Sequence, residues 1–305
     1  MLQNVFKHFM LLICLTFALV SNISYAALAH TSGYVQVDKA KLYYQRFGTG
    51  TPILVLHGGP GLDQSYLQPQ MLELAKQHEV IFYDQRGSGK SLDTTMEATY
   101  FNLKQFTKDV EAVRQQLGID KVIVLGHSFG GLLGMSYAIT YPEHVSKLIL
   151  VATTPADISG IMASAQEIAK RTAPFEEELY PLSDYQELEK LDAAQIAKLH
   201  RKLFSVYMHD PKDADKLTLT MSAESVRSGF KVYEMFSKSL FINLFPQLKK
   251  LQIPTLIIHG TSDIVPMWTV EQIQKAIPNA QLKVIENCGH FSYIEKQDEF
   301  LKLVN

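Results

Sequence analysis

Ser128, Asp263 and His290 could together perform nucleophilic catalysis on a carbonyl group. A serine hydroxyl is a weak nucleophile until a base removes its proton, and an acid must hold that base in the useful orientation. The three residues occur in the order Ser, Asp and His but lie far apart in the chain, so only the tertiary structure can bring them together. Asp157 is an alternative acid, should Asp263 be exposed and unpaired.

Ser128 is the best nucleophile candidate because of its sequence context. It lies in Gly126-His127-Ser128-Phe129-Gly130, which follows the apolar run 121–125 and precedes the small-residue segment 131–138. This context predicts a sharp turn between a strand and a helix, where a β-carbon on a neighbouring residue would collide with the backbone. The alternative is a glycine-rich turn that only links two elements.

A second glycine-rich loop, His57-Gly58-Gly59-Pro60-Gly61, follows the apolar segment 53–56. Acyl transfer needs N–H donors for the oxyanion that develops, and glycines allow the backbone to come close to that charge. The sequence therefore predicts an oxyanion hole formed by the backbone N–H groups of Gly59 and Phe129. A tight turn without this function is the alternative interpretation.

These residues require strands that end at one edge of a sheet. Strand-like segments are expected at about 34–38, 41–47, 52–57, 79–84, 121–126, 146–152, 254–259 and 281–286. After the first pair they alternate with helical patterns, and their continuous apolar runs suit strands covered on both faces. The fold class is therefore α/β, with a mostly parallel eight-stranded sheet and helices on both faces. Asp263 and His290 each follow a strand's carboxyl end, where such sheets place their chemistry.

The predicted strands stop between Thr154 and about Phe245, where the sequence becomes charged, helical and aromatic. We expect a core formed by residues 27–154 and 246–305, with an inserted helical cap at 155–245. Because the cap interrupts the sheet between strands whose ends carry the candidate triad, it should cover Ser128 and shape the substrate pocket.

The N-terminus is typical of a signal peptide. Lys7 precedes a twelve-residue apolar stretch, and small residues lead to Ala26, so we predict cleavage after residue 26 and export to the periplasm or the medium. The apolar stretch is shorter than the ~20 residues that span a bilayer, which disfavours an uncleaved anchor and any stable membrane insertion after cleavage. A lipoprotein signal at Cys14 is disfavoured because Leu12-Ile13 precede it.

The composition restricts the kinds of partner that the protein can be expected to bind. The 29 basic and 31 acidic residues give a formal charge of -2, which provides no field for nucleic acid. Cleavage would leave Cys288 as the sole cysteine, interpreted as structural. The histidines lack the pairing of a metal site, so no metal and no cofactor are expected. The predicted partner is a small molecule or short peptide, and the sequence determines no oligomeric state.

The motifs His57–Gly61 and Asp84-Gln85-Arg86-Gly87-Ser88-Gly89-Lys90-Ser91, with the serine turn, Asp263 and Gly289-His290, resemble the proline iminopeptidase branch of the α/β-hydrolases. The resemblance covers roughly residues 34–305. It implies an aminopeptidase that releases an N-terminal residue, proline or a small or apolar one, from short peptides through an acyl-enzyme. Members that prefer proline commonly have Gly-Gly-Ser-Trp-Gly at the turn, whereas Gly-His-Ser-Phe-Gly is common among esterases.

An aminopeptidase must bind a free α-ammonium, which needs carboxylate partners in a water-poor pocket. The resemblance implies acidic cap residues, and the candidates are Glu176–Glu178, Glu224 and Glu234. Glu234 is preferred because its aromatic helix leads back toward the core, and a solvated helix face is the alternative. Arg86 is interpreted as scaffold that pins loops under the site. A carboxylesterase or lipase-like hydrolase and a non-catalytic binding protein remain the rival functions.

Overall fold

The computed structural model describes residues 30–92, 97–238 and 241–305, so the predicted signal peptide at 1–26 lies outside the described residues. Eight strands form one sheet, in the order β1-β2-β4-β3-β5-β6-β7-β8. The strands are β1 (His30–Val37), β2 (Ala40–Phe47), β3 (Thr51–Leu56), β4 (His78–Tyr83), β5 (Val122–His127), β6 (Val145–Val151), β7 (Thr255–Gly260) and β8 (Ala280–Ile285). Strands β1, β2 and β4 pair antiparallel, and every other neighbouring pair is parallel. The predicted fold class and all eight predicted strands are confirmed.

Helices cover both faces of the sheet, which explains the continuous apolar runs of its strands. In β3, Leu54 and Leu56 pack into one core while Ile53 and Val55 pack into another. The first core also contains residues of α2 (Leu103–Gln116), α3 (Phe129–Thr140), α9 (Phe245–Leu248) and α10 (Met267–Ala276). The second contains residues of η1 (Gln64–Leu67), η2 (Gln70–Lys76), α11 (Ser292–Glu295) and α12 (Gln297–Val304). The side chains on each face of a strand are therefore buried under helices.

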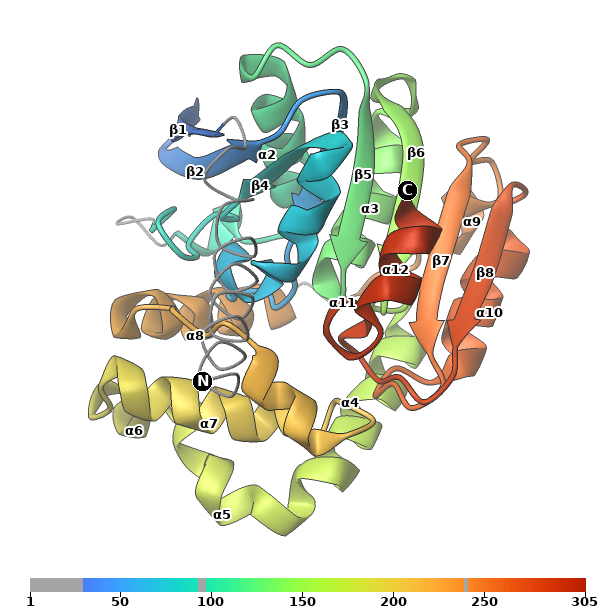
Figure 1. The fold of residues 1–305 in the computed structure, drawn as a ribbon. Helices are drawn as coiled ribbons and strands as arrows, with labels where there is room; N and C mark the ends of the chain where they lie inside the picture. The colour runs from blue at the N-terminus through green and yellow to red at the C-terminus, as the bar shows by residue number, and fades with distance from the viewer. Residues whose placement is uncertain (1–29, 93–96, 239–240) are drawn as a thin grey trace, which may run out of the picture.

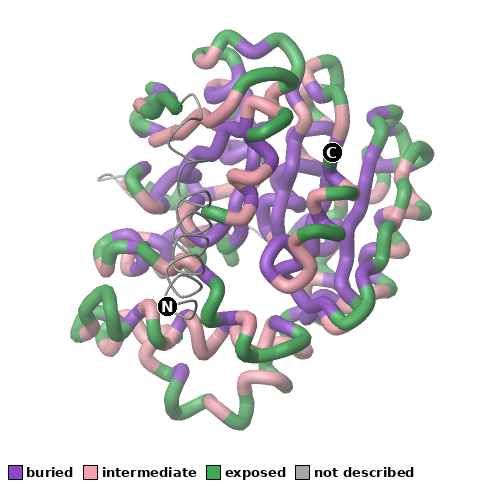
Figure 2. Tube along the Cα trace, viewed as in Figure 1, coloured by how far each residue is buried: buried purple, intermediate pink, exposed green. Residues whose placement is uncertain are grey.

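The described residues of the segment predicted as the cap, between β6 and α9, form helices and no strand. The α-helices are α4 (Ile158–Thr172), α5 (Glu176–Leu179), α6 (Tyr185–Glu189), α7 (Ala193–Ser205) and α8 (Ala223–Ser237). The remaining short 3-10 helices are η3 (Ala98–Tyr100), η4 (Pro142–His144), η5 (Ala173–Phe175), η6 (Tyr180–Leu182) and η7 (Pro211–Lys216). Figure 1 shows α4 to α8 gathered at one end of the sheet, and Figure 2 shows mostly buried strands in the sheet and many exposed or half-buried residues in these helices.

The insertion is closed at its base. Asp157 and Asn243 form an antiparallel bridge where the chain leaves and re-enters the core. The carboxylate of Asp157 accepts a hydrogen bond from the N–H of Gly160 at 3.0 Å and so caps α4. The side chain that the sequence offered as an alternative catalytic acid is therefore used to begin a cap helix. Among the residues that the structure describes, no helix combines the length and hydropathy needed to cross a bilayer.

Candidate active site

Ser128 lies on a strained turn between β5 and α3. Its backbone has φ 56° and ψ -120°, a conformation that costs a non-glycine residue about 1–3 kcal/mol. The flanking glycines make the turn possible, because a β-carbon at Gly126 would lie 2.2 Å from the Gly130 oxygen and one at Gly130 would lie 2.0 Å from the Leu56 oxygen. Ser128 remains partly exposed at the end of its strand. Ser128 therefore stands at the carboxyl end of β5, directly before the first residue of α3.

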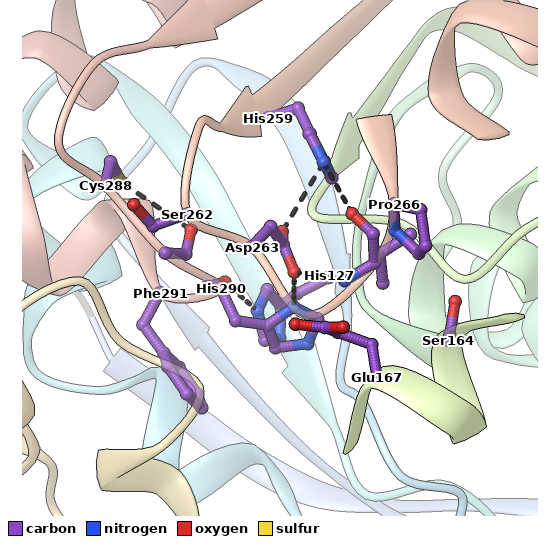
Figure 3. Close-up of polar contacts among 12 residues, drawn as sticks. His127, Ser164, Glu167, His259, Ser262, Asp263, Pro266, Cys288, His290 and Phe291 are labelled. Atoms are coloured by element: carbon purple, nitrogen blue, oxygen red, sulfur yellow. Dashed lines mark hydrogen bonds and ion pairs between the residues drawn. The ribbon is translucent and has the colours of Figure 1, made fainter. Parts of the chain in front are cut away.

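The structure brings Asp263 and His290 together. His290 Nδ1 lies 2.8 Å from Asp263 Oδ1, and the carboxylate can only accept, so the imidazole carries its proton on Nδ1. This tautomer leaves Nε2 free to act as a base. The same Asp263 oxygen also accepts the N–H of Val265 at 2.9 Å. Figure 3 shows the carboxylate between His259 and His290.

The buried carboxylate of Asp263 stays ionised. Burial by itself would raise its pKa, but His290, His259 and the hydrogen bonds outweigh burial and lower the pKa to about 2. His259 Nδ1 lies 3.5 Å from the other carboxylate oxygen, and its Nε2 lies 3.0 Å from the carbonyl oxygen of Val265. Burial lowers the pKa of His259. A carboxylate that is ionised at neutral pH is what an imidazolium formed at His290 needs beside it.

Hydrogen bonds also hold the backbone around His290. The N–H of His290 donates to the carbonyl of Tyr207 at 2.9 Å. The N–H groups of the residues on both sides donate to the carboxylate of Glu295 at 2.9 and 3.1 Å, and that of His209 donates to it at 2.7 Å. Burial raises the pKa of Glu295. Glu295 therefore connects the loop of the candidate base to the segment that follows α7.

The loop after β3 orients the predicted oxyanion donor. His57 Nε2 accepts the N–H of Gln85 at 2.9 Å, so its proton lies on Nδ1 and is donated to the carbonyl of Gly58 at 2.8 Å. Burial lowers the pKa of His57 to about 4, which keeps the ring neutral. Because a peptide is planar, fixing the Gly58 carbonyl also fixes the direction of the Gly59 N–H. A β-carbon at Gly58 would lie 3.1 Å from Ser128 Cβ, so this loop touches the nucleophile.

The second predicted donor, Phe129, is the first residue of α3. The first N–H groups of a helix have no acceptor within the helix, so this N–H is available at the turn. The Phe129 ring packs against Phe106 of α2 and Phe236 of α8, with centroid distances of 5.9 and 4.9 Å. The core and the cap together therefore fix the residue that follows Ser128.

The segment 84–91 connects the elements around the site. Asp84 accepts the N–H groups of Gln64 and Lys90 at 3.1 and 2.8 Å. Arg86 makes a bidentate pair with Asp109 of α2 at 3.0 and 2.7 Å, and both side chains are fully buried. The structure therefore gives Arg86 the scaffold position that the sequence suggested.

The helix α8 packs on both glycine-rich loops. Ser225 and Ser228 form hydrogen bonds with the N–H of Gly89 at 2.8 Å and the carbonyl of Gly87 at 2.7 Å. A β-carbon at Gly229 would lie 2.1 Å from the oxygen of Gly61. The close approach of the cap to the core thus requires a residue without a side chain.

Glu234, the predicted ammonium-binding residue, lies elsewhere on α8. Its side chain is 59% exposed and pairs with Lys238 at 3.1 Å. The cap face that meets the catalytic loop instead carries Arg171 of α4, which donates to the carbonyls of Ser262 and Asp263 at 2.9 and 3.0 Å. The structure does not bring Glu234 to the Asp263–His290 pair, and its assignment stays a prediction.

Sequence reasoning gave no role to five residues of the site. Tyr66 and His127 contact each other at 2.8 Å, and the other three are Arg171, Tyr207 and Glu295. None of them lies in a pattern that reveals its contacts, because the partners are distant in sequence or are backbone groups. Cys288, by contrast, is a buried free thiol whose pKa is raised by burial, so it does not compete with Ser128 as nucleophile. Within the described ranges, no three side chains of His, Cys, Asp or Glu lie close enough together to hold a metal ion.

Known proteins resemble this chain in sequence. A relative from Heyndrickxia coagulans, called proline iminopeptidase, is 28% identical over 286 residues, covering 90% of this chain and 97% of its own. Another of that name, from Saccharolobus solfataricus, is 27% identical over 281 residues, covering 89% and 90%. The chain is thus similar to proline iminopeptidases over most of its length.

Solved structures share the fold. An alpha/beta fold family hydrolase from Bacillus anthracis has a TM-score of 0.74 at 22% identity and covers 92% of this chain and 99% of its own. A proline iminopeptidase from Mycobacterium smegmatis has a TM-score of 0.69 at 23% identity, covering 90% and 96%. A family model described as alpha/beta hydrolase fold matches residues 51–297, which include every candidate catalytic residue. With this match, the sheet order and the serine turn in hand, the chain belongs to the α/β-hydrolase fold family.

Proposed function

We propose that this protein is a serine hydrolase of the aminopeptidase type, which releases an N-terminal proline or a small or apolar residue from short peptides. The observation that carries the proposal is the 2.8 Å pair of Asp263 and His290 in a chain whose Ser128 lies on a strained turn. The similarity to proteins called proline iminopeptidase supports the choice of substrate class.

In this scheme Ser128 Oγ attacks the scissile carbonyl while His290 Nε2 takes its proton. The N–H groups of Gly59 and Phe129 stabilise the oxyanion of the tetrahedral intermediate. The imidazolium then gives its proton to the leaving amine, and an acyl-enzyme remains on Ser128. Water attacks this ester with His290 again as base, and Asp263 holds the tautomer throughout. His290 then returns this proton to Ser128 Oγ as the ester bond breaks, so one water is consumed in each turnover and the enzyme regains its starting protonation state.

The free amine of the substrate needs a carboxylate from the cap. Glu234 would have to leave Lys238 and its exposed position to reach a bound ammonium. Glu167 of α4 is a second candidate, because its partner Arg171, at 2.8 Å, also binds the carbonyls of the Asp263 loop. In Figure 3 the Glu167 side chain extends from α4 in the direction of the Asp263–His290 pair.

The proposal is tested by kcat/KM of residues 27–305 on prolyl, alanyl and leucyl arylamides, on their N-acetylated forms and on short p-nitrophenyl esters. We expect arylamide cleavage that acetylation lowers by at least about tenfold, since the acetylated substrate has no ammonium to pair with a carboxylate of the cap. The Gln variant of the residue that binds the ammonium, Glu167→Gln or Glu234→Gln, should have a raised KM for the free-amine substrate. Its turnover of esters should be unchanged. If the protein cleaves only the esters, it is an esterase and the aminopeptidase proposal is wrong.

We also propose that the protein is exported and that the mature chain begins at residue 27. The basic residue Lys7, the short apolar stretch and the small residues before Ala26 support this proposal. The intact mass of the protein recovered from the periplasm or medium of an expressing bacterium measures the cleavage site. Full-length protein in the cytoplasm would contradict export.

A further inference from the structure

Tyr66 and His127 lie between the three loops that carry the proposed chemistry. Tyr66 comes from η1 and is fully buried, and His127, the last residue of β5, is 1% exposed. The two side chains meet at 2.8 Å, between Tyr66 Oη and His127 Nδ1. On either side of this contact they bind the backbone of a catalytic loop.

The hydrogen bonds form a chain with one consistent direction. The N–H of Gly58 donates to Tyr66 Oη at 2.7 Å. His127 Nε2 lies 2.9 Å from the carbonyl oxygen of His290, which can only accept, so Nε2 carries the ring proton. His127 Nδ1 is then the acceptor, and the Tyr66 hydroxyl donates to it. Each of these donors has one acceptor.

This chain of hydrogen bonds requires a neutral His127. Burial is the largest cause that lowers the pKa of His127, and the nearby His290 lowers it further, to about 3. Burial also raises the pKa of Tyr66, so its hydroxyl keeps its proton. The proton positions are therefore the same throughout the pH range in which a serine hydrolase works.

The groups joined by these hydrogen bonds belong to residues that are next to a proposed catalytic residue in the sequence, or to the catalytic residue itself. Gly58 precedes the oxyanion donor Gly59, His127 precedes Ser128, and the bound carbonyl belongs to His290 itself. A misplacement of about 1 Å between such groups can cost about 100-fold in rate.

We propose that Tyr66 and His127 are positioning residues, which form a strut that sets the distances between oxyanion hole, nucleophile and base. This inference rests on the proposed Ser128 chemistry but not on the substrate being a peptide. The hydrogen bonds of the strut to the catalytic loops reach only backbone groups, and the His127 ring also packs on the His290 ring at a centroid distance of 4.9 Å. Tyr66 and His127 take no part in proton transfer to the substrate. It acts on kcat, because it holds groups that work on the transition state.

Tyr293 offers a matched control. It is a buried tyrosine whose ring also packs on His127, at a centroid distance of 5.3 Å, but its hydroxyl has no hydrogen-bond partner among the described residues. Tyr66→Phe and Tyr293→Phe therefore remove the same atom from two buried rings that both pack on His127. Only the first change breaks the strut.

The test measures kcat and KM for a p-nitrophenyl ester and an arylamide in these variants, with near-UV circular dichroism as the folding control. We expect Tyr66→Phe to lower kcat by about 10- to 100-fold with KM within about twofold, and Tyr293→Phe to change neither. His127→Phe should lower kcat similarly. The double variant Tyr66→Phe/His127→Phe should have a kcat no lower than that of the less active single variant, because both substitutions break the same strut.

His127→Gln keeps an N–H donor for the His290 carbonyl, so it should retain more of kcat than His127→Phe. This comparison carries the test if Tyr66→Phe does not fold. Equal kcat values for the two His127 variants, or wild-type kcat in folded Tyr66→Phe, would overturn the strut. A wild-type protein without Ser128-dependent turnover on either substrate would overturn the proposed function instead, so the two failures are distinguishable.

Discussion

Replacing Ser128 by alanine is expected to lower kcat by on the order of 10⁶-fold, the loss found when the nucleophile of a dissected serine protease is removed. Alanine cannot form the acyl-enzyme, and the oxyanion donors and substrate binding by themselves give little turnover. The fold should survive, because alanine keeps the β-carbon that the turn already accommodates at φ 56°. Arylamide and ester turnover, together with labelling by a fluorophosphonate, measure the loss.

Ser128→Gly is the control that separates chemistry from folding. Glycine adopts the positive φ of this turn without the strain of a β-carbon, so this variant should be inactive yet more stable than Ser128→Ala by about 1 kcal/mol. Urea unfolding followed by circular dichroism measures the difference. Near wild-type turnover in either variant would exclude Ser128 as the nucleophile.

The second large effect is expected for Asp263→Asn, which should lower kcat by about 10⁴-fold. Asparagine has almost the same shape but no charge to stabilise the imidazolium, and an amide N–H₂ turned toward His290 Nδ1 would favour the tautomer whose proton lies on Nε2. The imidazole would then be unable to accept the proton of Ser128. Steady-state kcat, with near-UV circular dichroism to show an intact fold, is the measurement.

Asp157→Asn is the matched control, because Asp157 is the other acid that the sequence offered. Asparagine caps helices as well as aspartate, so the cap of α4 and the turnover should both be retained. A large loss of kcat in Asp157→Asn with wild-type kcat in Asp263→Asn would assign the acid role to Asp157.

The charge of Asp263 also has a defined pH range. Its pKa in the folded protein, about 2, lies below the ordinary value of 3.8, so ionised Asp263 favours the folded state. This contribution is fully present above about pH 4 and is lost as the pH falls through 2. Titration of Asp263 therefore does not produce any fall of kcat/KM seen between pH 5 and 7.

The fold was predictable because its signals are local. The apolar run of β5, the glycines around Ser128 and the small residues that open α3 are each visible in a few neighbouring residues. Strand order follows less directly, yet the position of Asp263 and His290 after β7 and β8 predicted that they would share one edge. The structure confirms that they meet, at 2.8 Å.

Assignments that depend on which helix face meets the core were not predictable in the same way. Glu234 and Val232 are two residues apart on α8, yet Val232 is fully buried and Glu234 is largely exposed. A helical pattern gives the period of a buried face, but the partner that buries it comes from another part of the chain. The sequence therefore identified α8 as a helix beside the site without identifying the side chains directed at it.

The sequence by itself determined the fold class, the order of the candidate catalytic residues and the turn that exposes Ser128, because glycine placement and strand patterns act over a few residues. Only the tertiary structure decided how those residues are held. His127 binds the carbonyl of a residue 163 positions away, and Tyr66 binds a ring 61 positions away. Such contacts leave no periodic trace, since one partner is a backbone atom or a single side chain brought close only when the sheet and its helices pack.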